Sequence, residues 1–314
     1  MKSKYQSPLI FNVFKPPRMS SYDVVRHYKR NLPKGFGKIG HFGTLDPFAS
    51  GVLMIGVNGA AKLNDFIHEI LPKTYLAIGK LGVETDTGDL TVEPSQLDDS
   101  EYLKKEISQF SIPFIQDFIE KRFIGEYMQA PHKYSAAKFE GKALHKWARE
   151  GVEIKKDQKK RFIHKIEVVK YNFPYLTIRF EVSSGTYIRT LFSDCANSLG
   201  TIGTLVSLVR EKVGGCTDKN YIKKSNWPDG EDWDLDQFGQ KVDDVLALGS
   251  ILFAEKEAKL YSNGVVLKSD RAQSIEKEGI SKEYYWVRDL ERNILGLAKI
   301  EDGVVKVKFN LSSN

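Results

Sequence analysis

The sequence predicts an α+β protein with two domains. Strand-like and helical segments alternate irregularly through the first 240 residues, which favours α+β over a doubly wound parallel sheet. Beyond residue 245, short strand-like runs bounded by turn residues follow one another, as in a small β-barrel. A length of 314 residues also exceeds what one hydrophobic core usually organises. We therefore expect one domain over residues 1–240 and a smaller one over residues 245–314.

Hydrophobic periodicity assigns the main elements of the first domain. Residues 52–57, VLMIGV, and residues 74–83 read as strands, and residues 102–110 as an exposed helix. Residues 175–192 read as a strand that passes through Ser183, Ser184 and Gly185 into a helix ending near Gly200. Between the first two strands, one face of a predicted helix collects apolar residues at i, i+3, i+4 and i+7. These residues are Leu63, Phe66, Ile67 and Ile70.

The acidic segment SNWPDGEDWDLDQFGQ, residues 225–240, marks the edge of the first domain, because its composition changes abruptly. The segment VDDVLALGS that follows predicts a short helix. The strand-like runs of the smaller domain come next, and they read GVVLK, EYYWVRD, ILGLAKI and VVKVKFN.

Bulk composition indicates a soluble protein of a reducing compartment. The chain is 41% hydrophobic and 28% charged, and no apolar run approaches the ~20 residues that span a bilayer. The N-terminus lacks the apolar core of a secretory signal. The two cysteines, Cys195 and Cys216, form neither a CxxC pair nor a zinc-binding spacing. We expect a cytoplasmic protein without a structural metal, in which both cysteines are small buried side chains.

Positive charge is concentrated in the first two-thirds of the chain. The net charge is +6, but residues 1–224 contain 35 Lys and Arg against 24 Asp and Glu. A basic domain of this kind favours a polyanionic partner, usually a nucleic acid. Solvated surface lysines would produce the same composition, so this observation leaves both interpretations open.

The loop GKIGHFGTLDPFASGVL, residues 37–53, contains a single carboxylate, Asp46. Pro47 restricts the backbone before it to extended conformations, and Gly40 and Gly43 accept angles that other residues avoid. Such a stiff loop holds one side chain in one pose, which suits a nucleophile or a general base. A turn aspartate that bonds its own backbone is the alternative, and taken alone an Asp-Pro loop favours it.

Motifs for other chemistries are absent from the sequence. It has no GxxxxGK[ST], HExxH or GxSxG pattern, the glycines of residues 37–43 match no dinucleotide fingerprint, and the six histidines are scattered. We therefore expect no metal, nucleotide or redox cofactor.

Several segments together resemble the TruB family of tRNA pseudouridine synthases. Residues 40–62, GHFGTLDPFASGVLMIGVNGAAK, are similar to the family's catalytic pattern GHxGTLDPxAxGVLxxxxGxATK. Further matches follow in the family's order: residues 15–25, 73–90, 128–151, SSGTYIRTLFSDCANSLG and LVSLVREKVGG. The tail from about residue 245 resembles, more weakly, the PUA RNA-binding domain of these enzymes. The resemblance covers the whole first domain.

The resemblance implies a pseudouridine-synthase fold, with a central mixed, mainly antiparallel sheet flanked by helices, and a PUA-like β-barrel. It also implies an isomerisation in which uracil leaves its ribose, rotates and rejoins it through carbon, with no cofactor. Asp46 matches the family's nucleophile. Attack at C1′ and a glycal-type route both remain open.

Site residues follow from the same motifs. Arg189 matches the arginine that pairs with the nucleophile, and we expect it to lower the pKa of Asp46. Tyr75 matches the tyrosine that stacks on the flipped uracil and relays the proton lost from carbon. The match also makes Tyr187 and Leu208 base-pocket residues, and His41 a contact to the RNA beside the vacated stack.

Three positions depart from the family pattern. Arg18 stands where the family usually has glycine, Ser184 where it has lysine, and Val209 where it has the first of two arginines. These changes bear on RNA affinity and loop geometry rather than on the chemistry.

The leading hypothesis is a monomeric enzyme that modifies the T-loop uridine, position 55, and binds the T-arm of tRNA. A guide-dependent, dyskerin-like synthase and a tRNA-folding chaperone without catalysis are the alternatives. The chain lacks the long basic extensions of the former, and the complete set of catalytic matches disfavours the latter.

Overall fold

The computed structural model describes residues 8–32, 37–130, 134, 138–143, 147, 150–152, 154, 157–230 and 233–311. Within these residues the dominant feature is a ten-stranded sheet, in which eight strands run in the order β14-β1-β3-β12-β4-β11-β10-β7. Two short strands join it at its middle, β2 beside β3 and β13 beside β12. The strands are β1 (Leu9–Lys15), β2 (Gly40–Phe42), β3 (Ser50–Val57), β4 (Lys73–Leu81), β7 (Gly125–Gln129), β10 (Lys159–Asn172), β11 (Tyr175–Val182), β12 (Gly203–Val213), β13 (Cys216–Thr217) and β14 (Gln240–Lys241).

The sheet consists of two antiparallel halves that meet at one parallel contact. Strand β3 runs parallel to β12 over two register pairs, Ser50 with Val209 and Gly51 with Arg210. The other pairings in this sheet are antiparallel among the described residues. The prediction of a mixed, mainly antiparallel sheet is confirmed.

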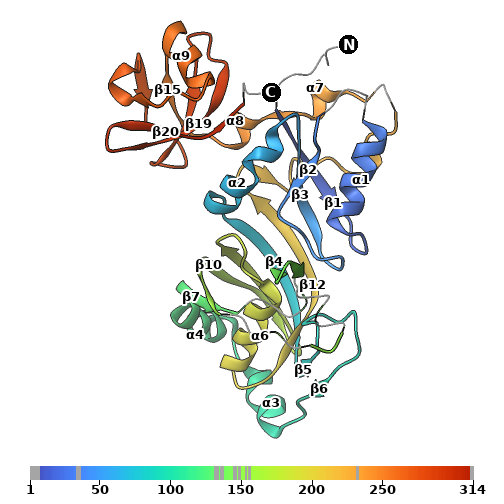
Figure 1. The fold of residues 1–314 in the computed structure, drawn as a ribbon. Helices are drawn as coiled ribbons and strands as arrows, with labels where there is room; N and C mark the ends of the chain where they lie inside the picture. Colours follow the sequence, from blue (N-terminus) through green and yellow to red (C-terminus); the bar gives the residue numbers. More distant parts are fainter. Residues whose placement is uncertain are drawn as a thin grey trace.

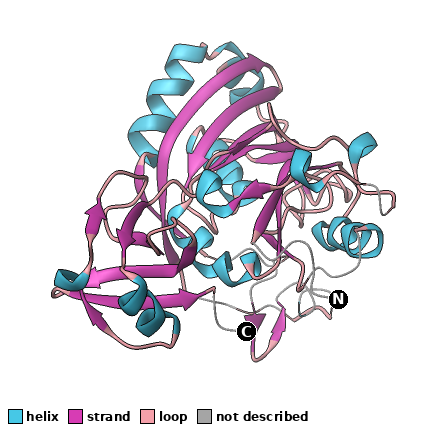
Figure 2. Ribbon diagram, turned by 90° about the horizontal axis from the view of Figure 1, so that it is seen from above, coloured by secondary structure: helices cyan, strands magenta, loops and turns pink. Residues whose placement is uncertain are grey.

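Helices flank both halves of the sheet (Figure 1), and Figure 2 shows them beside its long curved strands. They are α1 (Ser21–Asn31), α2 (Asn64–Ile70), α3 (Glu101–Lys105), α4 (Ile112–Phe123), α6 (Ile188–Ser198), α7 (Leu235–Phe238) and α8 (Val242–Val245), with short 3-10 turns at Ala60–Leu63, Ile107–Gln109 and Lys224–Asn226. In β3, Leu53 packs with α1 while Met54 packs with α2, so the apolar run VLMIGV is buried on both faces.

Two sequence expectations need correction. Residues 102–110 form α3 and a 3-10 turn rather than one exposed helix, because Leu103 and Ile107 are buried in the core. The helix predicted after β3 begins as a 3-10 turn, and Ile70 is only half-buried. By contrast, the strand and helix predicted over residues 175–192 are confirmed as β11 and α6, and Gly200 follows the helix with a left-handed φ of +91°.

The acidic segment packs against the first half of the sheet. Trp227 and Trp233 are buried beside Tyr28 of α1, with ring centroids 6.0 and 5.8 Å from it. Strand β14 then pairs with β1 at the sheet's edge. These contacts bury two large aromatic side chains from a segment whose other residues are mostly polar.

Residues 249–310 form a second, six-stranded sheet of order β16-β20-β19-β18-β15-β17. Its elements are β15 (Gly249–Leu252), α9 (Glu255–Ser262), β16 (Leu267–Lys268), β17 (Ser274–Glu276), β18 (Tyr284–Arg288), β19 (Ile294–Glu301) and β20 (Val304–Asn310), with a 3-10 turn at Ser269–Arg271. The four predicted strand runs fall on β16, β18, β19 and β20, although only the last two residues of GVVLK are in β16. The unit has its own core around Phe253 and Tyr261.

The second sheet contacts α2 and the residue that ends α8. The Phe66 ring lies edge-on to Tyr284 with centroids 4.7 Å apart, and the Trp286 indole N–H donates to the Leu246 carbonyl over 2.9 Å. Two further short hairpins pair β5 (Val83–Glu84) with β6 (Gln96–Leu97), and β8 (Lys138–Phe139) with β9 (Lys142–Ala143). None of the helices in the described ranges combines the length and the apolar character that a bilayer crossing needs.

Candidate active site

The loop that carries Asp46 connects β2 to β3, at the point where the two halves of the sheet join. Gly43 begins the loop with a left-handed φ of +80°. The Arg210 guanidinium, fully buried on β12, donates to the carbonyl of Gly43 over 3.0 Å and to that of Val52 over 2.8 Å. One side chain therefore ties both ends of the loop to the parallel contact.

A second set of contacts fixes the loop from the N-terminal side. The Ser21 hydroxyl accepts from the Leu45 N–H over 2.9 Å and donates to the Leu45 carbonyl over 3.1 Å. Lys15 donates to the carbonyls of Met19 and Pro47 over 2.7 and 3.4 Å. Burial lowers the pKa of this lysine to about 8. Asp46 is thus held by backbone that is bonded on both sides.

Arg189 projects from the first turn of α6 to Asp46. Its Nε lies 3.0 Å from the Asp46 carboxylate, and the side chain is 5% exposed. Nη1 donates to the Thr87 carbonyl over 2.6 Å and lies 3.7 Å from the Asp89 carboxylate, while Nη2 donates to the Tyr134 carbonyl over 3.2 Å. All three guanidinium nitrogens are therefore engaged, and the orientation of Arg189 is over-determined.

The pKa of Asp46 is raised, although Arg189 is its partner. Burial in the cavity is the largest cause, and the nearby Asp89 carboxylate acts in the same direction. The Arg189 guanidinium lowers the pKa but does not outweigh the loss of water. The expectation of a net decrease is therefore wrong in direction. A more basic carboxylate is also a stronger nucleophile and base when it is ionised.

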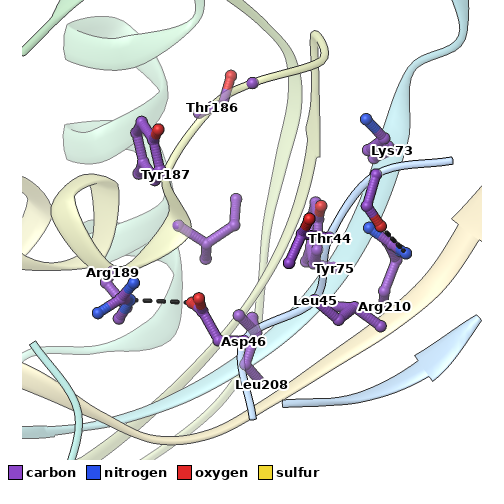
Figure 3. A pocket seen from close by; sticks show the side chains of 13 residues that line it. Thr44, Leu45, Asp46, Lys73, Tyr75, Thr186, Tyr187, Arg189, Leu208 and Arg210 are labelled. Carbon is purple, nitrogen blue, oxygen red and sulfur yellow. Dashed lines mark hydrogen bonds and ion pairs between the residues drawn. The ribbon is translucent and has the colours of Figure 1, made fainter. Parts of the chain in front are cut away.

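Asp46 opens into a cavity of about 190 Å³ (Figure 3). Tyr75 comes from β4, Leu208 from β12, and Tyr187 immediately precedes α6. The remaining lining residues are Gly43, Thr44, Leu45, Lys73, Gly185, Thr186, Ile188, Arg189 and Arg210. Five of the six residues singled out in the sequence therefore share one cavity.

His41 lies outside this cavity. It lines a neighbouring hollow with Lys38 and Asn64, and Gly43 and Thr44 line both spaces. Its buried Nδ1 has no hydrogen-bond partner among the described residues, and burial lowers the pKa of the imidazole. The hollow that His41 lines is therefore separate from the Asp46 cavity but shares two residues with it.

Sequence reasoning missed three residues that the fold brings to the site. Gln129 accepts from the Tyr187 N–H over 2.8 Å and donates to the Tyr187 carbonyl over 3.0 Å, so it fixes the start of α6. Asp89 is the second carboxylate on Arg189, and Lys73 lines the cavity. All three fall within segments that resemble the TruB family, which was the available signal. Much of the rest of residues 128–151 lies outside the described residues.

The three departures from the family pattern have clear environments. Arg18 adopts a left-handed φ of +65°, an uncommon conformation for a residue with a Cβ, and its N–H donates to the Pro47 carbonyl over 2.7 Å. The Ser184 hydroxyl accepts from Lys73 Nζ over 2.6 Å. Val209 pairs with Ser50 at the parallel contact.

Comparison with known proteins places the chain in a class of enzymes, the pseudouridylate synthases. In a solved complex of Cbf5, Nop10 and Gar1, the matched chain shares this fold with a TM-score of 0.69 and 21% identity, over 96% of this chain and 84% of that one. The family model described as "TruB family pseudouridylate synthase (N terminal domain)" matches residues 29–188 of this chain.

Full-length relatives agree with this match. The tRNA pseudouridine synthase B of Clostridium tetani is 35% identical over 304 residues, 96% of this chain and 98% of the relative. The enzyme of the same name from Clostridium acetobutylicum is 36% identical over 95% of this chain and 97% of the relative. The chain belongs to the TruB family of pseudouridylate synthases.

Proposed function

We propose that this enzyme isomerises the T-loop uridine at position 55 of tRNA to pseudouridine. Membership of the family makes the chain an isomerase that converts uridine in tRNA. The nearly full-length similarity to tRNA pseudouridine synthases favours a stand-alone enzyme, since the likeness to Cbf5 at 21% identity concerns the fold alone. The observation that carries the proposal is the 3.0 Å ion pair between Asp46 and Arg189 inside a cavity.

The reaction balances within the substrate. The bond from N1 to C1′ breaks, the base rotates, and a bond from C5 to C1′ forms. The C5 proton leaves and N1 gains one, so no oxidant or second substrate is consumed. Asp46 acts as nucleophile at C1′ or through a glycal-type route. In either case the ionised carboxylate is the reactive species, and Arg189 keeps it oriented and offsets part of the burial that favours protonation.

A cavity of about 190 Å³ suits one nucleobase, which must leave its stack to reach Asp46. We assign Tyr75 as the stacking platform, a contact worth on the order of 1–3 kcal/mol per base. Tyr187 and Leu208 line the same space from its other sides. His41, in the adjoining hollow, contacts the RNA that the uridine has left.

We further propose two domains over residues 1–240 and 245–314, the second a PUA-like barrel that contacts the T-arm. Its six-stranded sheet with a separate core supports this assignment. The positive charge of residues 1–224 supports phosphate contacts by the first domain. We assign a monomer and a cytoplasmic location.

The test is conversion of an unmodified tRNA transcript by purified protein without guide RNA, with pseudouridine mapped chemically to the nucleotide. Wild-type protein should convert position 55, and Asp46→Asn should bind but not convert. Asp117→Asn, an exposed acid on α4 paired with Lys121, is the matched control and should retain activity.

Each failure identifies a different function. Binding without conversion by the wild type would leave a tRNA chaperone. Conversion only after addition of a guide RNA would make the protein a dyskerin-like synthase. Conversion at another uridine would refute the T-loop assignment while keeping the chemistry.

A further inference from the structure

The cavity contains a second cationic side chain, on the side of Asp46 away from Arg189 (Figure 3). Lys73 begins β4, two residues before Tyr75, and strand alternation places both side chains on one face of the sheet. Its Nζ donates to the Ser184 hydroxyl over 2.6 Å. The amino group is therefore held at a defined point of the cavity wall.

This ammonium group is buried, and no carboxylate of the described residues pairs with it. Lys73 is 4% exposed, and the charged groups that act on it are the guanidinium groups of Arg210 from β12 and Arg161 from β10. Asp46 is the only acid among the described lining residues, and it faces Arg189. Burial and the two arginines lower the pKa of Lys73 to about 7. An uncompensated charge in such a place is costly unless a ligand supplies the missing anion.

Arg161 adds to this cationic end of the cavity. Its Nη1 donates to the Ser184 carbonyl over 3.4 Å. Its Nε is buried with no hydrogen-bond partner among the described residues. Lys73, Arg161 and Arg210 therefore converge where no described carboxylate pairs with them.

Two glycines bring backbone without a side chain close to the Lys73 and Arg161 cationic groups. A Cβ on Gly43 would lie 3.3 Å from Lys73 Nζ, and one on Gly185 would lie 3.0 Å from the Arg161 guanidinium. Both glycines line the cavity. The cavity wall beside both cationic groups is therefore partly bare backbone, which leaves them facing the cavity.

We propose that Lys73, held by Ser184 and backed by Arg161, binds a non-bridging oxygen of the phosphodiester attached to the flipped uridine. The cavity then has two subsites, a base subsite at Tyr75 and a phosphate subsite at Lys73. The occupant is an RNA phosphodiester because a monoanion directly linked to the nucleotide in the cavity supplies the one charge that the lysine lacks. This inference rests on the proposed function for the identity of the RNA.

The experiment combines enzyme variants with neutralised phosphates. T-arm stem-loop RNAs carry a methylphosphonate at the phosphate 5′ or 3′ to the target uridine, or at a stem phosphate as control. Wild type, Lys73→Gln and Lys80→Gln are compared in single-turnover conversion and equilibrium binding. Lys80 lies on the same strand, on the opposite face, and is the matched control.

We expect Lys73→Gln to weaken binding of unmodified RNA by about 10- to 100-fold, the range of a hydrogen bond to a charged group. One of the two flanking methylphosphonates should weaken wild-type binding similarly, yet have little further effect on Lys73→Gln. The stem methylphosphonate should act equally on all three proteins. Ser184→Ala, which keeps the ammonium but loosens it, should show a smaller loss.

Independent penalties from the variant and from both flanking methylphosphonates would overturn the phosphate subsite, provided the wild type converts unmodified RNA. If the wild type binds but does not convert, the proposed function fails, while the binding comparison still decides the subsite. Thermal unfolding separates misfolding from lost contact. Lys73→Gln should melt no lower than wild type, because it removes an uncompensated buried charge.

Discussion

The two ends of the cavity treat buried positive charge in opposite ways. Arg189 meets Asp46, Asp89 and two backbone carbonyls, so the protein itself supplies its counter-charge. Lys73 meets a hydroxyl and faces two further cations. The first arrangement is complete before the substrate arrives, and the second is complete only with an anion. Folding alone therefore fixes the catalytic geometry at Arg189. At Lys73, by contrast, the favourable electrostatic contact forms only when a ligand binds.

The largest effect on activity is expected from substitution of Asp46, at the first end of the cavity. Asp46→Asn should lower the single-turnover rate by at least about 10⁴-fold, as loss of a nucleophile does in other enzymes. The variant should unfold at or above the wild-type temperature, because the raised pKa shows that the ionised carboxylate is destabilised by burial and Arg189 keeps Asp89 as a partner. Retained turnover would remove Asp46 from the reaction.

Arg189 tests whether the two ends differ in function. Arg189→Ala should reduce the rate by about 10²- to 10³-fold, the cost of losing one electrostatic contact at a reacting group, with a much smaller change in RNA affinity. Rate and binding constants measured on the same RNA provide the comparison. Equal losses of both would make Arg189 a phosphate contact and the two ends alike.

Substitution of Asp89 tests the first end of the cavity through the pH dependence of the reaction rate. The Asp89 charge raises the pKa of Asp46, so Asp89→Asn should move the acid limb of the rate profile to lower pH. In the wild type that limb should lie above the ordinary range of aspartate. We also expect about a tenfold lower maximal rate, because Arg189 loses one of its anchors. An acid limb unchanged by this substitution would contradict the coupling.

The lowered pKa of Lys73 should make the free energy of unfolding depend on pH. Its pKa is about 7 in the folded protein, below its ordinary value, so between pH 7 and about 10 the unfolded chain binds a proton that the folded chain does not. The free energy of unfolding therefore rises with pH over this range and falls towards pH 7. Urea unfolding of wild type and Lys73→Gln at pH 6 and pH 9 should show the variant's relative advantage shrinking at pH 9. An advantage independent of pH would mean that Lys73 titrates normally.

The smallest expected effect concerns Arg18, whose side chain lines neither end of the cavity. Its left-handed backbone suits glycine, so Arg18→Gly should raise the free energy of unfolding by up to about 1 kcal/mol, with turnover unchanged. Thermal unfolding and the conversion assay check both parts. A marked decrease in stability would show that the Arg18 side chain makes a contact worth more than the backbone strain.

Local patterns predicted the elements that hold the site. The apolar run of β3 and the sequence from β11 through Gly185 into α6 could be read directly, because strand and helix periods and glycine positions are local properties. The prediction of one exposed helix over residues 102–110 was wrong, because burial of Leu103 and Ile107 depends on distant partners. Sequence reasoning also missed Lys73, whose hydroxyl partner Ser184 lies 111 residues away in the chain.

The sequence by itself determined the family, the stiff loop around Asp46 and the identity of Arg189 as the partner of Asp46. Motifs and the backbone restraints of glycine and proline are properties of neighbouring residues, so they can be recognised without the fold. Only the tertiary structure decided the direction of the Asp46 pKa, the separation of His41 from the cavity and the cationic surroundings of Lys73. These properties depend on how much water and which charges surround a group. That environment is assembled from strands and helices distant in the chain, so no local pattern contains it.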